Sequence, residues 1–425
     1  MKMPSYSDYK DSGVDWLGMI PSEWKSLRLK FAAPLQNRKI EAINTKLPYV
    51  GMENVESGTG RFIESEEQLI AEGMSNHFQK SDVLFGKLRP YLAKALLTEW
   101  DGVCSSEFLV LRGAHVTPEF LHYYVLFDEF IKQVDSSTYG SKMPRASWDF
   151  IGNMMIPIPS MSEQRAISSF LDRETEKLDT LIAKQERLIE LAQEKRQAII
   201  SHAVTKGLNS DIEMTDCDEE WLQSVPSHWE IIRLGALFRE INESGHEDLP
   251  ILQVSIHHGV SDRQLDDDET DKKVVRSEDK SKYKKVQPKD LVYNMMRAWQ
   301  GGFGTVTVTG MVSPAYVVAR PQKQISTEFI EQLLRTPNAI EKIRLHSRGV
   351  TDFRLRLYWD EFKSIKVALP PKEEQEEIMS FVKGEIESFE VLTSKCRRNI
   401  ELMREHRTAL ISAAVTGKID VREAA

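Results

Sequence analysis

The sequence predicts an α+β protein made of two tandem copies of one unit, each a mixed globular domain followed by a long helix. Three observations predict it: an internal repeat, two long segments with heptad spacing, and short strand-like and helix-like runs between them. Two copies predict pseudo-twofold symmetry, and their helices are expected to pack as an antiparallel coiled coil. The expected boundaries are 1–160 and 209–370 for the globular domains, 161–208 for the central helix and 371–418 for the C-terminal helix.

The internal repeat is visible from the first tryptophans onward. The stretch 16–24 recurs at 221–229, 205 residues later, and the offset then rises to 208 and 211 residues, as short loop insertions would produce. Duplication without functional symmetry is the alternative, but both copies keep the same order of elements. The further matched segments are 82–89 with 290–297, 148–149 with 359–360, 163–164 with 374–375, and 203–205 with 414–416.

The composition fits two domains with cores in a reducing compartment. The chain has 425 residues, of which 41% are hydrophobic. It has no long uncharged apolar run, and its start lacks the apolar core of a signal peptide, so we expect a cytoplasmic protein without a membrane span. Cys104, Cys217 and Cys396 are far apart, which argues against a disulfide framework and a structural zinc site.

The globular parts mix strand and helix patterns. The runs 108–111 and 316–319 are β-branched or aromatic and predict strands, as does the alternating, glycine-bounded run 304–310. Residues 119–132 and 328–344 predict helices.

The two long helices have clear starts and apolar rows. Ser160 to Glu163 form a capping-box pattern, and Pro370-Pro371 precede the second helix. Each helix would span about 60 Å. We expect the helices to pack on each other as a spacer of fixed length; the alternative is that the rows dock on another protein. The rows are Leu171, Leu178, Ala192 and Ile199 beside Leu181 and Leu188, then Val382, Phe389, Cys396, Met403 and Leu410 beside Leu392.

The motifs of common enzyme classes are absent from the sequence. It has no phosphate-binding GxxxxGK[ST] loop, no GxGxxG dinucleotide fingerprint, and no Asn/Asp-Pro-Pro-aromatic run of a DNA amino-methyltransferase. The pair His257-His258 lacks metal-site spacing, and the acidic run 266–269 is more typical of a solvated loop than of a cation site.

Basic residues gather at matching places in the two globular parts. Lys and Arg neutralise phosphates, and Arg can form paired hydrogen bonds with guanine. The net charge of −9 counts against simple DNA binding, but binding depends on where charge is placed. The groups include Lys87, Arg89 and Lys94 in the first copy, and Lys272, Lys273, Arg276, Lys280, Lys282, Lys284 and Lys285 in the second.

Several stretches together resemble one family, the specificity subunits of type I restriction-modification systems. Residues 9–24 are similar to the start of these subunits, and Asp82-Val83-Leu84-Phe85-Gly86-Lys87-Leu88-Arg89-Pro90-Tyr91 resembles a strand-and-turn motif of their target recognition domains. The prolines that lead into Glu163-Gln164 and Glu374-Gln375 resemble the entries to their two helices. The resemblance spans nearly the whole chain, in order, twice.

The resemblance implies a non-catalytic protein that recognises a split, asymmetric double-stranded DNA sequence. Each target recognition domain would recognise one half, while the helices would set the gap and dock two DNA adenine methyltransferase subunits. Restriction subunits with translocase and nuclease activity would join this core. The chain itself would need no cofactor, because S-adenosylmethionine, ATP and Mg²⁺ would be used by the partners.

Carried over by position, the resemblance selects DNA-contact candidates in both domains. In the second copy Met295 replaces Lys87, which suits two domains that recognise different half-sites. For Arg89 and Arg297 the competing interpretation is an internal salt bridge, whereas the tryptophans of both copies are expected in the core. The candidates are Lys87, Arg89, Tyr139, Gly140, Ser141, Lys142 and Arg145 in the first domain, and Arg297, Arg348, Thr351, Arg354 and Arg356 in the second.

Two other functions compete with this interpretation. A nuclease or methyltransferase acting alone is opposed by the missing catalytic motifs. A coiled-coil adaptor that binds only protein remains the main alternative, and sequence-selective DNA binding by the assembled complex would exclude it.

Overall fold

The computed structural model divides into two compact units. The first unit is Met1–Glu186 with Arg397–Ala425, and the second is Arg187–Cys396, so both unit boundaries fall inside the long helices. The residues that the structure describes are 4–41, 45–64, 73–255, 259–261, 280–349 and 355–423.

The first unit contains two four-stranded sheets and two short antiparallel pairs. One sheet has the antiparallel order β4 (Leu35–Gln36), β11 (Phe108–Leu111), β8 (Val83–Gly86), β9 (Ala95–Leu97). The other has the order β5 (Lys39–Glu41), β7 (Met74–Phe78), β10 (Gly102–Cys104), β6 (Tyr49–Val50), in which β10 and β6 are parallel. The pairs are β1 (Tyr9–Asp11) with β2 (Met19–Pro21), and β3 (Lys25–Arg28) with β12 (Met155–Ile158).

The second unit repeats the first of these sheets among its described residues. The sheet β16 (Phe238–Ile241), β23 (Tyr316–Pro321), β20 (Leu291–Asn294), β21 (Phe303–Thr305) has the same antiparallel order as the first sheet of unit one. The fold therefore repeats as the sequence does. The remaining pairs are β13 (Met214–Asp216) with β14 (Ser224–Pro226), β15 (Glu230–Arg233) with β24 (Lys366–Leu369), β17 (Gln253–Ser255) with β18 (Gly259–Ser261), and β19 (Lys284–Val286) with β22 (Gly310–Val312).

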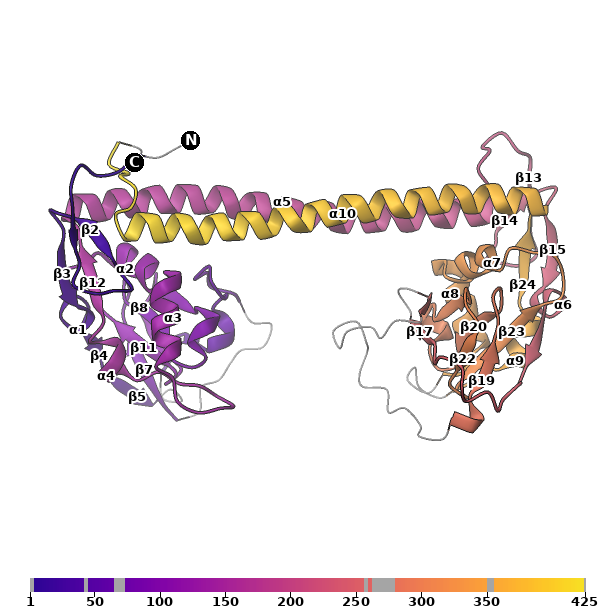
Figure 1. Ribbon diagram of the computed structural model, residues 1–425, viewed down its shortest axis with the longest axis horizontal. Helices are drawn as coiled ribbons and strands as arrows, with labels where there is room; N and C mark the ends of the chain where they lie inside the picture. The colour runs from indigo at the N-terminus through magenta and orange to yellow at the C-terminus, as the bar shows by residue number, and fades with distance from the viewer. Residues whose placement is uncertain are drawn as a thin grey trace. The chain divides into compact units, whose positions relative to one another are not determined.

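Short helices cover the sheets in both units (Figure 1). In the first unit they are α1 (Leu29–Ala32), η2 (Met52–Asn54), η3 (Pro90–Leu92), α2 (Pro118–Val125), α3 (Asp128–Ser136) and α4 (Trp148–Ile151). In the second they are α6 (Leu234–Leu237), η4 (Lys280–Lys282), η5 (Ala298–Gln300), α7 (Thr327–Leu334), α8 (Pro337–His346) and α9 (Trp359–Ser364).

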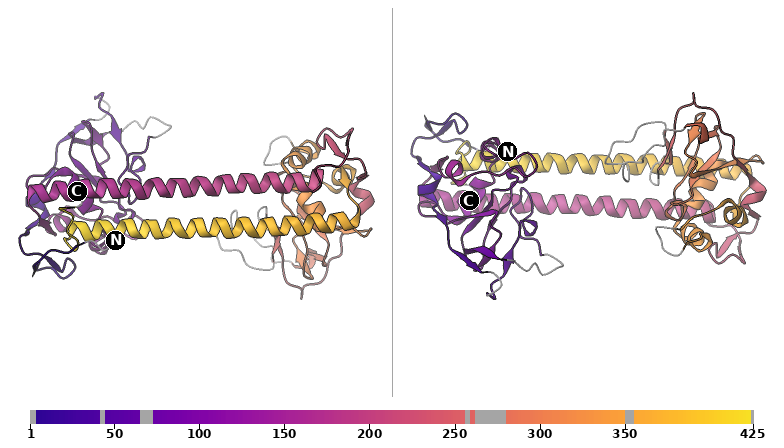
Figure 2. Two further views of the ribbon diagram at one scale, coloured as in Figure 1. Left: turned by 90° about the horizontal axis from the view of Figure 1, so that it is seen from above. Right: turned by 90° about the horizontal axis from the view of Figure 1, so that it is seen from below.

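The long helices α5 (Met161–Lys206) and α10 (Lys372–Val415) have 46 and 44 residues and lie side by side within each unit (Figure 2). In the first unit Asp179 faces Arg407 at 3.4 Å and Glu186 faces Arg404 at 3.1 Å. Residue numbers rise along one helix as they fall along the other, so the helices are antiparallel. The predicted α+β class with packed long helices is confirmed.

Only one of the two predicted apolar rows is covered on each helix. In α5, Leu171 and Ala192 are buried, whereas Leu181 and Leu188 of the adjoining row are 48% and 40% exposed. In α10, Val382 and Cys396 are buried, whereas Leu392 of the adjoining row is 36% exposed. The first row is covered, in part by the cores of the globular domains, and the second leaves apolar side chains at the surface.

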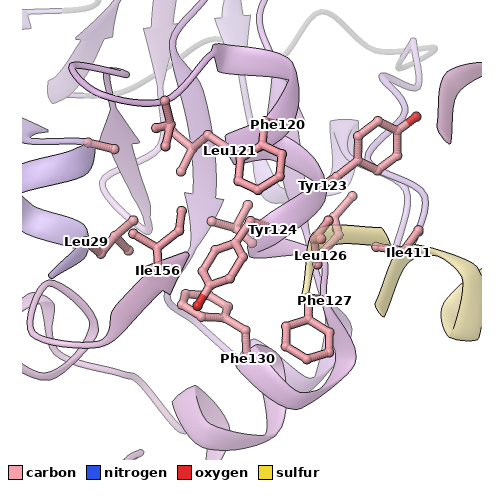
Figure 3. Close-up of a cluster of buried hydrophobic side chains, with 14 of the residues drawn as sticks. Leu29, Phe120, Leu121, Tyr123, Tyr124, Leu126, Phe127, Phe130, Ile156 and Ile411 are labelled. Carbon is pink, nitrogen blue, oxygen red and sulfur yellow. The ribbon is translucent and has the colours of Figure 1, made fainter. Parts of the chain in front are cut away.

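The core of the first unit includes the end of the chain. Phe85 of β8 and Tyr124 of α2 pack against Phe130 of α3, with ring centroids 5.7 and 5.3 Å apart. Figure 3 shows this cluster reaching Ile411, which α10 contributes and which is 2% exposed. The last turns of the C-terminal helix therefore complete the core of the first globular domain.

Two predictions of secondary structure were wrong in extent. Each predicted helix, 119–132 and 328–344, is a pair of helices. In the second copy Thr336 caps a new helix by accepting a hydrogen bond from the Ala339 amide, and Pro337 starts it. The predicted strand 304–310 ends at Thr305 and resumes at Gly310, because its two ends pair with different strands.

Candidate nucleic-acid interface

The structure brings the first-domain candidates together. The Arg89 amide donates to the Pro144 carbonyl at 2.8 Å, and the Ala146 amide donates to the Lys87 carbonyl at 3.0 Å. These bonds fasten the turn after β8 to the loop 139–146, although more than 50 residues separate them in the chain. Tyr139 and Arg145 also exchange two backbone hydrogen bonds of 3.1 Å, which closes the loop into a hairpin.

The cations of this site differ in whether they have a protein partner. Lys87 and Arg89 form no ion pair with any residue in the described part of the chain. Arg145 instead donates to both Glu107 oxygens, with its Nη2 at 2.9 Å from Oε1, and these hydrogen bonds raise its pKa. The internal salt bridge considered for Arg89 thus occurs at Arg145, where it holds the loop in place.

Arg89 has a backbone conformation that is uncommon for a side-chain-bearing residue. Its φ is 49° and its ψ is 62°, in the left-handed region. This conformation costs roughly 1–2 kcal/mol, and such residues gather at functional sites. The turn that follows, η3, places Tyr91 at the surface with 54% of its area exposed.

Two large aromatic side chains lie exposed at this site, and only one of them is among the candidates predicted from the sequence. Tyr139 is a candidate and is 65% exposed, whereas Tyr91 belongs to the repeated motif but is not a candidate. An exposed aromatic ring beside unpaired cations suits contact with nucleotides. The signal that could have identified Tyr91 is its place directly after Arg89-Pro90 in that motif.

The second domain places its candidates in the same way but with different contacts. The Leu357 amide donates to the Met295 carbonyl at 2.9 Å, next to Arg297, while Arg348 and Arg356 exchange backbone hydrogen bonds of 2.9 and 3.0 Å. Arg348 forms an ion pair with Glu361. Arg297 has no left-handed backbone, and Gly301 supplies the left-handed residue of this turn. Thr351 and Arg354 lie outside the described residues.

An ion pair between a buried aspartate and a partly exposed arginine supports the strand behind each site. Asp82 at the start of β8 is buried and accepts from Nε and Nη2 of Arg112 at 2.6 and 2.7 Å. Asp290 accepts from Arg320 in the same way at 2.8 Å. The repeated aspartate therefore anchors the strand that carries Lys87 and Arg89 or their counterparts.

The repeated Glu-Gln pair joins each domain to its helix. Gln164 accepts from the Thr117 amide at 2.7 Å and donates to the Pro159 carbonyl at 3.0 Å, while Gln375 repeats both bonds at 2.8 Å. Glu163 closes the predicted capping box with Ser160. Both glutamates also accept from a core tryptophan, Trp24 or Trp229. The expectation that these tryptophans are core residues is confirmed.

The described residues contain no group of three or more His, Cys, Asp or Glu side chains placed to hold a metal ion. His257, His258 and the acidic run 266–269 lie outside the described residues. None of the helices in the described part is long and apolar enough to cross a membrane.

Comparisons with known proteins point to one family. Residues 21–191 match the family model of the type I restriction modification DNA specificity domain. The chain is 24% identical over 341 residues to the type I restriction enzyme EcoKI specificity subunit of Escherichia coli K12. This alignment covers 75% of this chain and 68% of that protein. It is 19% identical over 191 residues to the EcoDI specificity subunit of Escherichia coli, and here the alignment spans 44% of this chain and 43% of the relative.

Solved structures agree with the fold. A chain from a study of complex assembly and conformational transition of the type I R-M system aligns with a TM-score of 0.67 at 19% identity, covering 93% of this chain and 98% of that one. The HsdS subunit from Thermoanaerobacter tengcongensis aligns with a TM-score of 0.54 at 18% identity, covering 94% and 98%. The predicted resemblance to type I specificity subunits is confirmed.

Proposed function

We propose that this chain is the DNA-specificity subunit of a type I restriction-modification complex, in which each globular domain recognises one half of a split DNA sequence. The match of residues 21–191 to a DNA specificity domain carries the proposal. The same sheet order in the second unit extends it to a second recognition domain. Because Met295 and Trp299 stand where the first copy has Lys87 and Tyr91, we expect the two half-sites to differ.

The chemistry of the first site supports contact with DNA. Lys87 and Arg89 form no ion pair among the described residues, so each can neutralise a phosphate or, for Arg89, bind a guanine edge. Lys142 and Tyr139 lie exposed on the hairpin that is fastened to the same turn. Contacts with the phosphate backbone of the DNA would set the docking position. The side chains at the turn would discriminate between bases.

Catalysis would belong to partner subunits, and this chain would be non-catalytic. Two DNA adenine methyltransferase subunits would use S-adenosylmethionine, and restriction subunits would use ATP and Mg²⁺. The exposed row with Leu181, Leu188 and Leu191 on α5 offers these partners apolar area that the helix pair leaves uncovered. The continuous helices α5 and α10 would keep the two recognition domains at a set distance.

The adaptor that binds only protein is not supported, because the matched family model is a DNA specificity domain. An enzyme acting alone makes a different prediction: the purified chain would methylate or cleave DNA without partners. Our proposal predicts neither activity from the chain by itself.

The first experiment is genome-wide sequencing of modified bases in a host with this chain and its cognate methyltransferase, and in the same host without the chain. We expect a split, asymmetric motif with methylated adenine only when the chain is present. If methylation is the same in both hosts while the methyltransferase is active, the chain does not determine its specificity.

A further inference from the structure

Arg407 lies where the first globular domain meets both long helices. It is only 8% exposed, although arginine is seldom buried. From α10 its Nη1 donates to the Gly58 carbonyl at 2.8 Å and its Nη2 to the Thr59 carbonyl at 3.3 Å. Its Nε lies 3.4 Å from Oδ1 of Asp179 on α5. One guanidinium therefore joins a turn of the domain to both helices.

The turn that Arg407 holds is closely packed against its neighbours. Gly58 and Gly60 have φ values of 76° and 73°, which glycine adopts without strain. A Cβ on Gly60 would lie 2.2 Å from Nε2 of His122, so a larger residue does not fit without displacement. Arg61 donates to Oδ2 of Asp179 at 2.6 Å, the carboxylate that also faces Arg407. The turn is thus attached to the helix pair at two adjacent points.

The contact depends on the shape of a guanidinium. Its donors point in fixed directions in one plane, so a single side chain can bind two carbonyls and face a carboxylate, which the single ammonium of lysine does less well. An arginine also stands at the matched position of the other long helix, because Arg196 and Arg407 are 211 residues apart, the offset of the Glu-Gln pairs.

We propose that Arg407 is a positioning residue that fixes the tilt of the first recognition domain on the helix pair, and with it the gap between half-sites that the complex accepts. The inference rests on the proposed function. A domain held by this three-way contact keeps one tilt. Without Arg407 the domain samples several tilts, and sites with neighbouring gaps become acceptable.

The test measures methylation rates of the chain assembled with its methyltransferase partner. The duplexes carry both half-sites separated by the native gap, by one base pair fewer and by one more. Arg407→Met is compared with Arg404→Met, a control one turn earlier on α10 whose ion pair with Glu186 is exposed. We expect Arg407→Met to lower the preference for the native gap by roughly tenfold, as small misplacements of bound groups commonly do. The gap preference of Arg407→Lys should lie between those of Arg407→Met and the wild type. The gap preference of Arg404→Met should equal that of the wild type.

Several outcomes would overturn the proposal. If Arg407→Met lowers the rate equally at all three gaps, the residue only stabilises the fold; an unchanged preference shows that it does not set the gap. If Arg407→Met does not fold, Asp179→Asn removes the facing charge at constant size, and it must loosen the gap preference in the same direction. A wild-type complex that methylates no split site would contradict the proposed function itself, before any variant is compared.

Discussion

At the scale of single residues, the candidate site of the first domain contains two cations, Lys87 and Arg89, that form no ion pair among the described residues. Arg145 is a predicted DNA contact, but in the structure it donates its side-chain hydrogen bonds to Glu107. Lys87 and Arg89 remain available, and Arg89 is held in a left-handed backbone by the Pro144 carbonyl. The structure therefore divides the candidates into one that supports the loop through Glu107 and two that have no ion-pair partner among the described residues.

The first prediction concerns these two cations. We expect Lys87→Ala and Arg89→Ala each to weaken DNA binding by the assembled complex, and to reduce the slope of log affinity against log salt by about 1 for each phosphate that is no longer neutralised. Binding at several salt concentrations checks this. Lys10→Ala is the control, since Lys10 is exposed on β1 away from the turn. A slope that matches the wild type in both variants would remove these residues from the set that neutralises phosphates.

The second prediction concerns His122, which contacts the Ala95 carbonyl beside Gly60. Burial, and to a smaller extent the charge of Arg407, lowers its pKa from 6.5 to about 4. Between these values the unfolded chain binds the proton and the folded chain does not, so stability is complete above pH 6.5 and falls as the pH drops toward 4. The decrease is at most about 3 kcal/mol.

Chemical denaturation of the wild type and His122→Gln across this pH range measures that decrease. The variant should lose less stability than the wild type as the pH falls from 6.5 to 4. Parallel curves for the two proteins would show that His122 is not the residue that titrates.

At the scale of elements, the two hydrogen bonds of a buried glutamine are repeated at the junction between each domain and its helix. The side chain of Gln164 or Gln375 satisfies an amide at the start of a domain helix and a carbonyl before the long helix. Both glutamines are buried, so an alanine would leave both partners without hydrogen bonds. Such orphaned buried groups cost about 1–3 kcal/mol each.

The third prediction is that Gln164→Ala destabilises the first unit and Gln375→Ala the second, each by about 2–4 kcal/mol. Hydrogen exchange resolved along the chain should show faster opening mainly in the unit that carries the change. Gln193→Ala, at an exposed position of α5, is the control. Faster exchange in neither unit would mean that these bonds do not hold the junction.

At the scale of the whole molecule, the exposed apolar rows of the helices indicate an assembly. Leu181 and Leu188 remain exposed on a helix whose other row is covered. A charge at these positions costs the isolated chain little, but it would have to be desolvated in a complex.

The fourth prediction is that Leu181→Asp combined with Leu188→Asp leaves the melting temperature of the chain within a few degrees, yet abolishes co-purification with the methyltransferase partner. Lys184→Asp, exposed on the same stretch of α5, is the control for added negative charge. Normal complex formation by the double variant would place the docking surface elsewhere.

Much of this architecture could be predicted from the sequence because it depends on local patterns. The repeat, the long helices and the capping box at Ser160 need only neighbouring residues or matched spacing, and the structure shows each of them. The site could be predicted in part: the sequence indicates the candidates around Lys87 and those around Tyr139, but not the bonds that fasten them together.

Only the tertiary structure decided those bonds, because they join segments that are distant in the chain. Glu107 pairs with the charge of Arg145, Gly58 and Thr59 accept hydrogen bonds from Arg407 near the C-terminus, and Ile411 completes the first core. Local propensity carries no information about such partners. Local propensity also does not determine which apolar row of a helix is covered, because that depends on packing. Nor does it determine where the predicted strand 304–310 breaks, because its two ends pair with different strands.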